Sequence, residues 1–197
     1  MSSDFWDWFR ENSEALKRIR SADSPEYAEL QRRVAQLSPD IDAEIGGSPS
    51  SDDLELVFTA HGEQRCFPLI DQIVGDAPLL GGWRIRALKP PLLEDFSVRY
   101  GDQEITTREI WLQIESTRDA PLRLAVAIRR ESDSDQDRNR ESAALLVIES
   151  FLGERAYALQ IAVDRFVDLP NDPSAEGFVS LRDVADRLRL SAIAVTL

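Results

Sequence analysis

Twice along this sequence, a segment with helical character lies between two segments with strand character. In the first case, residues 54–60 and 83–88 alternate so that one face of each strand is more apolar than the other, as in half-buried strands. In the second case, which covers residues 122–168, strand-like segments flank an apolar helix predicted over residues 143–152. Two such βαβ units predict an α+β fold of the split βαβ kind, in which helices cover one face of an antiparallel or mixed sheet.

Two further helices are predicted before the first unit. Ser3 or Asp4 can cap the first of them, and Ser24-Pro25 places a cap and a proline at the start of the second. We therefore expect an N-terminal helical hairpin within residues 1–45, a linker, and an α+β core over residues 54–197. At 197 residues the chain has the length of one ordinary domain, so a single domain is predicted for residues 1–197.

The second half of the chain carries further strand and loop signals. Residues 96–100 and 104–116 are predicted as strands joined by a hairpin turn, and residues 157–169 as a long strand. The charged segment 131–140 is predicted as a polar loop. Ser180 and Asp183 have the spacing of a capping box, which predicts that a last helix begins there.

The net charge of the chain limits the classes of partner that it is expected to bind. The formal net charge is −13 and the sequence pI is about 4.5. Phosphate groups and anionic membrane surfaces repel such a protein, so we expect neither nucleic-acid nor membrane binding. Another protein, and in particular a basic one, is the partner compatible with this charge. The sequence makes no prediction of the oligomeric state.

Cysteine usage and the N-terminal residues indicate the compartment. Cys66 is the only cysteine, so the chain has no internal disulfide of the kind that secreted domains use. The first ten residues lack the basic and apolar regions of a signal peptide, and no apolar run reaches the length of a membrane span. These features predict a cytoplasmic protein.

Two segments match the beginning of a known metal-binding motif, and neither match is complete. His61-Gly62-Glu63 matches a fragment of the zinc deaminase signature, but the two cysteines that would follow it are missing. The acidic run over residues 133–137 opens like a calcium loop and lacks that loop's glycine and final glutamate. We therefore predict no metal site and no cofactor. No catalytic residue can be named, and a non-enzymatic function is favoured.

Aromatic side chains are concentrated near the N-terminus, at Phe5, Trp6, Trp8 and Phe9. One interpretation is that they pack the first helix onto the sheet. The other is that Trp6, Trp8 and Phe9 bind a partner, since tryptophan and phenylalanine are enriched at interfaces. Trp6 lies off the apolar stripe that contains the other three, so it is expected to be exposed and to anchor the contact.

Three hypotheses about function follow. The leading one is a non-enzymatic protein-interaction module that uses an acidic or aromatic surface. The second is a small-ligand-binding protein or a hydrolase with an acidic site, in which Lys89, Arg86 and His61 are the ligand candidates. Lys89 ends a predicted strand before a loop, where binding sites are common. The third is an immunity-type protein that neutralises a basic partner.

Three short segments also resemble a family of uncharacterised bacterial proteins. They are the aromatic helix at residues 5–9, the segment Ala77-Pro78-Leu79-Leu80-Gly81-Gly82-Trp83 with Ala87-Leu88-Lys89-Pro90, and Phe151-Leu152-Gly153-Glu154. The resemblance implies a bacterial cytoplasmic protein. It implies no catalytic residue, because the family has no assigned activity.

Overall fold

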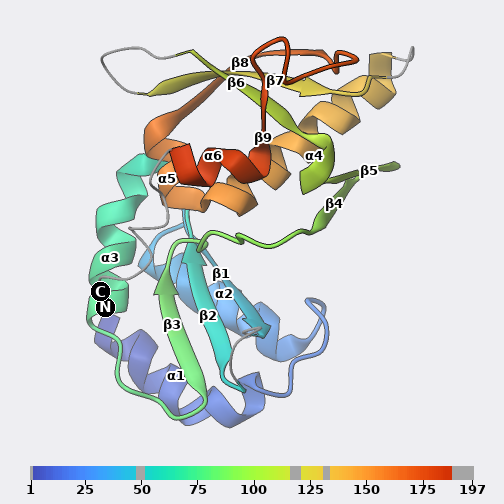
Figure 1. Cartoon of the computed structure of the whole chain (residues 1–197). Coiled ribbons are helices and arrows are strands. Elements are labelled where there is room, and N and C mark those ends of the chain that lie inside the picture. The colour runs from blue at the N-terminus through green and yellow to red at the C-terminus, as the bar shows by residue number, and fades with distance from the viewer. Residues whose placement is uncertain (1, 48–51, 116–120, 131–133, 188–197) are drawn as a thin grey trace. The chain divides into compact units, whose positions relative to one another are not determined.

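A computed structural model describes residues 2–47, 52–115, 121–130 and 134–187. The chain divides into two compact units, Met1–Lys89 (unit 1) and Pro90–Leu197 (unit 2). The described residues form six α-helices and three small sheets (Figure 1), which confirms the α+β class. The strands are thus distributed over three sheets instead of one. A single domain over residues 1–197 stays a prediction.

The sheet of unit 1 has three strands, in the order β1 (Asp42–Gly47), β2 (Leu54–Thr59) and β3 (Trp83–Ala87). The strands β1 and β2 are antiparallel, whereas β2 and β3 are parallel and are connected through α3 (Phe67–Gly75). The first predicted βαβ unit is therefore confirmed. The strand β1 was not predicted, because its acidic residues and two glycines have low strand propensity.

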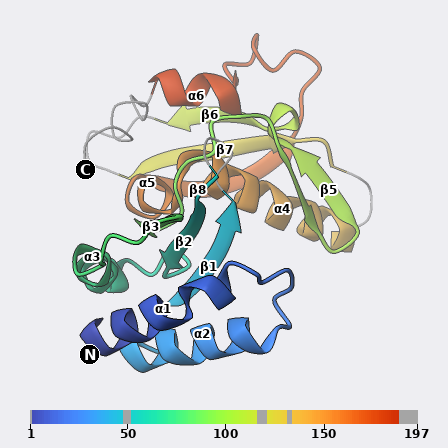
Figure 2. The same ribbon diagram turned by 90° about the horizontal axis from the view of Figure 1, so that it is seen from below.

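The predicted N-terminal helical pair is confirmed. It consists of α1 (Ser2–Leu16) and α2 (Pro25–Leu37), which lie side by side (Figure 2). The Ser24 side chain caps α2 by accepting a hydrogen bond of 3.2 Å from the Tyr27 amide. The helices belong to the same unit as the sheet, since Tyr27 and Gln31 of α2 both donate to the Ala43 carbonyl of β1.

One face of this sheet forms the core of unit 1. Ala43 of β1 and Leu56 and Phe58 of β2 point to this face, and all three are fully buried. Aromatic rings of α1 contact this face, with centroid distances of 5.7 Å from Phe5 to Phe58 and 5.0 Å from Phe9 to Trp83. The packing interpretation of the aromatic cluster thus holds for Phe5 and Phe9.

The expectation that Trp6 is exposed is wrong. Its side chain is only 3% exposed, and its indole N–H donates to the carbonyl of Ile73 at 3.0 Å. This carbonyl is one of the last four of α3, which have no partner within the helix. Trp6 is buried because it fills the space between α1 and α3 and satisfies that carbonyl.

Gly82 precedes β3 in a backbone conformation that other residues rarely adopt, with φ +77°. A Cβ added there would lie 2.9 Å from Nζ of Lys17, which donates to the Gly81 carbonyl and pairs with Glu14. We expect Gly82→Ala to lower the free energy of unfolding by about 1–2 kcal/mol, chiefly through backbone strain. Urea unfolding followed by circular dichroism measures this change.

Gly81→Ala is the matched control, because no atom lies within 4 Å of a Cβ at that position and its φ is not positive. It should change the free energy of unfolding by less than about 0.5 kcal/mol. Equal losses in both variants would contradict the assigned backbone conformation.

Unit 2 contains a four-stranded sheet and a hairpin. The sheet has the order β8 (Ile161–Asp168), β7 (Leu122–Ile128), β6 (Trp111–Glu115) and β9 (Val179–Ser180). The strands β7 and β8 are parallel, and α4 (Ser134–Leu152) with α5 (Glu154–Gln160) connects them, which confirms the second βαβ unit. The hairpin consists of β4 (Ser97–Tyr100) and β5 (Gln103–Thr106).

The core of unit 2 lies between this sheet and α4. Val126 of β7 packs in one buried cluster with Val147 and Phe151 of α4 and with Val184 of α6 (Leu181–Arg187). The predicted last helix is confirmed as α6. The Ser180 hydroxyl accepts from the Asp183 amide at 3.3 Å and donates to the Asp183 carboxylate at 2.7 Å, so it caps the helix start without the full pair of bonds of a capping box.

Three boundaries in unit 2 differ from the sequence-based expectation. Residues 134–140 are helical, because ion pairs such as Arg140–Glu109 (2.6 Å) hold the polar start of α4. Residues 157–160 belong to α5 and not to a strand. The predicted strand over residues 104–116 is broken by a 3₁₀ turn at Thr107–Glu109, whose capping box uses Thr106 and Glu109. The first and the third of these features depend on polar contacts that hydrophobic periodicity does not reveal.

A partly exposed carboxylate in unit 2 gives a prediction about pH. Hydrogen bonds from Arg182 and Arg108 lower the pKa of Asp95 from 3.8 to about 2. A carboxyl whose pKa is lowered on folding contributes stability above its unfolded pKa and loses it as the pH falls through the folded pKa. We therefore expect this contribution to be complete above pH ~4 and to disappear between pH ~4 and ~2.

The variant Asp95→Asn should remove this part of the acid dependence in thermal unfolding scans between pH 2 and 6. Glu94→Gln is the control, because Glu94 is exposed and makes no ion pair with any described residue. An unchanged acid dependence in Asp95→Asn would show that the two arginines do not stabilise the carboxylate.

Candidate functional site

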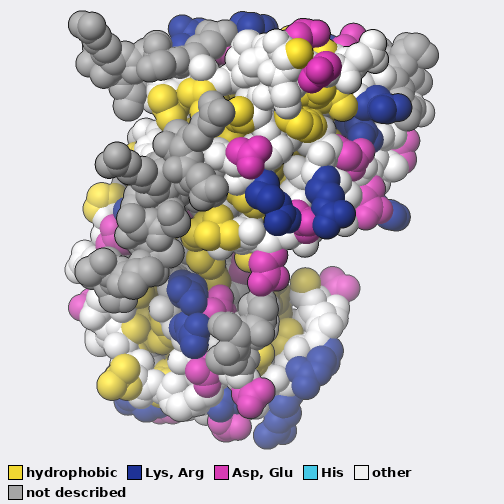
Figure 3. Space-filling view, in the orientation of Figure 1, with side chains coloured by type: hydrophobic (Ala, Val, Ile, Leu, Met, Phe, Trp, Pro, Cys, Tyr) yellow, Lys and Arg dark blue, Asp and Glu magenta, His cyan; other side chains and the backbone are white. Residues whose placement is uncertain are grey.

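The second face of the unit 1 sheet carries charged side chains around one partly buried valine, Val57. The strand register places Asp42 and Glu44 of β1, Glu55 of β2, and Arg84 and Arg86 of β3 on this face, opposite the buried apolar residues. Figure 3 shows Lys and Arg side chains over β3 with acidic side chains next to them. Alternation along three short strands thus separates the core from a charged surface.

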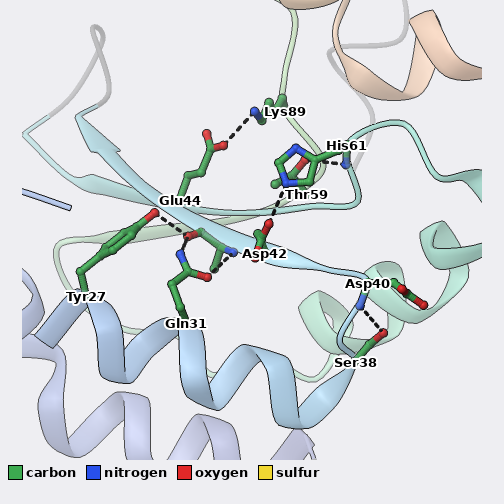
Figure 4. Close-up of polar contacts among 10 residues, drawn as sticks. Tyr27, Gln31, Ser38, Asp40, Asp42, Glu44, Thr59, His61 and Lys89 are labelled. Carbon is green, nitrogen blue, oxygen red and sulfur yellow. Dashed lines mark hydrogen bonds and ion pairs between the residues drawn. The ribbon is translucent and has the colours of Figure 1, made fainter. Parts of the chain in front are cut away.

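All three ligand candidates are in unit 1, and each lies close to a carboxylate. Nζ of Lys89 is 2.8 Å from Glu44, and Nε2 of His61 is 2.8 Å from Asp42 (Figure 4). Nε of Arg86 is 3.0 Å from Glu55. An anionic ligand would therefore compete with these carboxylates. Ligand binding by the three residues stays a prediction.

The charges along β3 are not balanced. Glu55, whose side chain is 13% exposed, is the only ion-pair partner of both Arg84 (3.8 Å) and Arg86 among the described residues. The Nε of Arg86 is buried and is not aligned to donate a hydrogen bond to that carboxylate. Two guanidinium groups share one carboxylate, so β3 carries a local positive charge in an acidic protein.

β3 is also an edge strand, with a neighbour on one side only among the described strands. In a parallel pair, alternate residues direct both backbone groups to the same neighbour. The bonds from Leu54 N to Gly82 O (3.1 Å) and from Leu88 N to Phe58 O (2.8 Å) mark the two ends of the β2–β3 ladder. The backbone N–H and C=O groups of Arg84 and Arg86 therefore point toward β2. Those of Ile85 and Ala87 point outward, away from β2.

An apolar hollow of about 460 Å³ opens beside this edge. Its walls are Trp83 and Ile85 of β3, Val74 of α3 and the loop over residues 77–81. Leu79 at its rim is as exposed as in an extended chain, at 104%. The buried indole N–H of Trp83 has no hydrogen-bond partner in the described part of the chain. Exposed apolar surface of this kind is typical of interaction sites.

The three aromatic interaction candidates, Trp6, Trp8 and Phe9, all belong to α1 and differ in exposure. Phe9 is fully buried and Trp6 nearly so, which leaves Trp8 as the partly exposed member of the three. The guanidinium of Arg33 lies 5.3 Å from the Trp8 ring centre, a cation–π contact. A direct contact with a partner could therefore involve Trp8 and not the buried pair.

Sequence reasoning assigned no role to Leu79. The signal was present as two leucines between a proline and two glycines, since apolar residues in a turn segment are not needed for a strand or helix face. Their exposure depends on how the loop closes over α3, which periodicity does not describe.

The described ranges contain neither a candidate metal centre nor a candidate membrane-spanning helix. Within them, no group of three or more histidine, cysteine, aspartate or glutamate residues is arranged to hold a metal ion. No helix in the described ranges combines the length and the apolar character that crossing a membrane requires.

No family model, curated protein or solved structure matches this chain. The resemblance to uncharacterised bacterial proteins accordingly stays a prediction.

Proposed function

We propose that this protein is a non-enzymatic interaction module that binds another protein through the hollow beside β3. The observation that carries the proposal is the full exposure of Leu79 at the rim of an apolar hollow. A large apolar side chain on the surface is stabilised when a partner removes it from water, by about 25 cal/mol for each Å² that is buried.

The distribution of charge favours this site over a uniformly acidic face. Unit 1 contains 16 acidic and 10 basic residues, and unit 2 contains 20 and 13. The negative charge is therefore shared almost equally, and it does not single out one surface for a basic partner. The immunity-type hypothesis depends on net charge alone, so we give it second place.

The protein is further proposed to act in a bacterial cytoplasm, as its resemblance implies. The single cysteine supports this location, because Cys66 is a buried free thiol. Proteins of reducing compartments keep their cysteines in this form.

The test compares three forms of the tagged protein as bait in lysate of its source. Leu79→Asp places a charge on the rim of the hollow, and Leu159→Asp places the same charge on an exposed leucine of α5. Neither change should alter the free energy of unfolding by more than about 0.5 kcal/mol, since both side chains are on the surface.

We expect a stoichiometric partner to be retained by the wild type and by Leu159→Asp and to be lost from Leu79→Asp. The amounts are measured by quantitative mass spectrometry. Retention of the same proteins by all three forms would contradict the proposed site.

A further inference from the structure

We propose that β3 receives an extended segment of the partner as a fourth strand of the unit 1 sheet, and that this segment alternates acidic and apolar residues. This inference rests on the proposed function and specifies its mode of recognition. In strand addition, backbone hydrogen bonds supply affinity and alternate side chains supply specificity.

The backbone of β3 provides the first part of the argument. Ile85 and Ala87 direct their N–H and C=O groups away from β2, as the ladder ends at Gly82 and Leu88 require. Neither residue hydrogen-bonds through these groups to another described residue. An unpaired strand edge is a template for an incoming strand.

The apolar hollow provides the second part. Side chains of an added strand would alternate between the two faces of the sheet. Those on the helix-covered face would lie beside Trp83 and Ile85, which form one wall of the hollow, and near the loop that carries Leu79. Every second residue of the segment would therefore be apolar.

The charge on β3 provides the third part. The remaining side chains of the segment would lie beside Arg84 and Arg86, which share the single carboxylate of Glu55. A carboxylate brought to this face would give the second guanidinium its own partner. The same position would repel a lysine or an arginine.

A second copy of the chain fits this edge poorly. Antiparallel pairing of two β3 strands about Ile85 would place Arg84 of one copy opposite Arg86 of the other. Like charges directly opposite each other destabilise a strand pair. The partner segment is therefore inferred to come from a different protein.

The experiment uses the full chain and three fluorescein-labelled peptides of seven residues. The first alternates glutamate and valine, the second has the same composition in two blocks, and the third replaces each glutamate with lysine. Fluorescence anisotropy measures affinity, and we expect the alternating acidic peptide to bind about tenfold more tightly than either control.

Residue-level amide hydrogen exchange shows where the acidic peptide binds. In the free protein the Ile85 and Ala87 amides should exchange quickly, and the Arg84 and Arg86 amides slowly. Bound peptide should slow the exchange of the Ile85 and Ala87 amides. The slowing factor should be close to the ratio of the free peptide concentration to its Kd. Ala87→Pro, which removes one outward N–H, should abolish this binding. If that variant does not fold, the exchange data on the wild type decide.

The outcomes separate the two proposals. If the peptide binds without protecting Ile85 and Ala87, strand addition is wrong, although a partner sensitive to Leu79→Asp would still support the hollow. If no peptide binds, the inference is overturned as well. If the free protein is a dimer in which these amides are already protected, a second copy occupies the edge and the inference is again wrong.

Discussion

Trp6→Ala is expected to lower the free energy of unfolding by about 3–5 kcal/mol, the usual range for removing a buried tryptophan. The indole is 3% exposed and contacts the rings of Phe5, Phe9 and Phe58 at centroid distances of 4.9–5.9 Å. Its removal leaves a cavity among these rings and deprives the Ile73 carbonyl of its donor. Urea unfolding monitored by circular dichroism gives the difference.

Two variants separate the contributions in this prediction. Trp6→Phe keeps most of the apolar volume and loses the hydrogen bond, so its cost should be about 1–3 kcal/mol. Trp8→Ala removes a partly exposed ring and one cation–π contact, so it should cost about 1 kcal/mol or less. A larger effect at Trp8 than at Trp6 would mean that the helix face is assigned incorrectly.

The second large effect is expected from proline in β3. Arg86→Pro removes an N–H that faces β2, and its ring would lie between the two strands, so we expect a loss of about 3 kcal/mol or more. Ala87→Pro removes an N–H that faces outward, and prolines are tolerated at such edge positions. Its cost should be about 1 kcal/mol, mainly from the fixed φ.

The two proline variants are measured by the same urea unfolding, and each is a control for the other. Equal destabilisation would show that the outward direction of the Ala87 amide is wrong. In that case the strand-addition inference would lose its geometric basis.

The sequence contained enough information to predict the two βαβ units, because alternation within the strands and apolar character in the helices come from neighbours along the chain. It did not contain enough to choose between Trp6 and Trp8. With 100° per residue, the two side chains lie roughly 80° to either side of the face formed by Phe5, Phe9 and Leu16. Packing of α1 against α3 decides the choice, and that contact joins distant parts of the sequence.

The candidate site, too, could be predicted only in part from the sequence. Lys89, Arg86 and His61 were identified from sequence, but two of their carboxylate partners, Glu44 and Asp42, come from β1, which has no strand signal. The open edge of β3 is a property of sheet order. Sheet order depends on which strands pair, and single-sequence patterns do not determine pairing.

Because the chain divides at Lys89, all of unit 1 is translated before unit 2. Each strand and helix of unit 1 comes from one continuous stretch, and β3 is the last strand in it. At 5–20 residues per second, translation of unit 2 takes on the order of 5–20 s. If unit 1 folds during that interval, β3 has a neighbour on one side only among the described strands while other nascent chains are close. We expect Arg84 and Arg86 to act as gatekeepers during that interval, since positive charges on a strand edge oppose pairing with an identical edge.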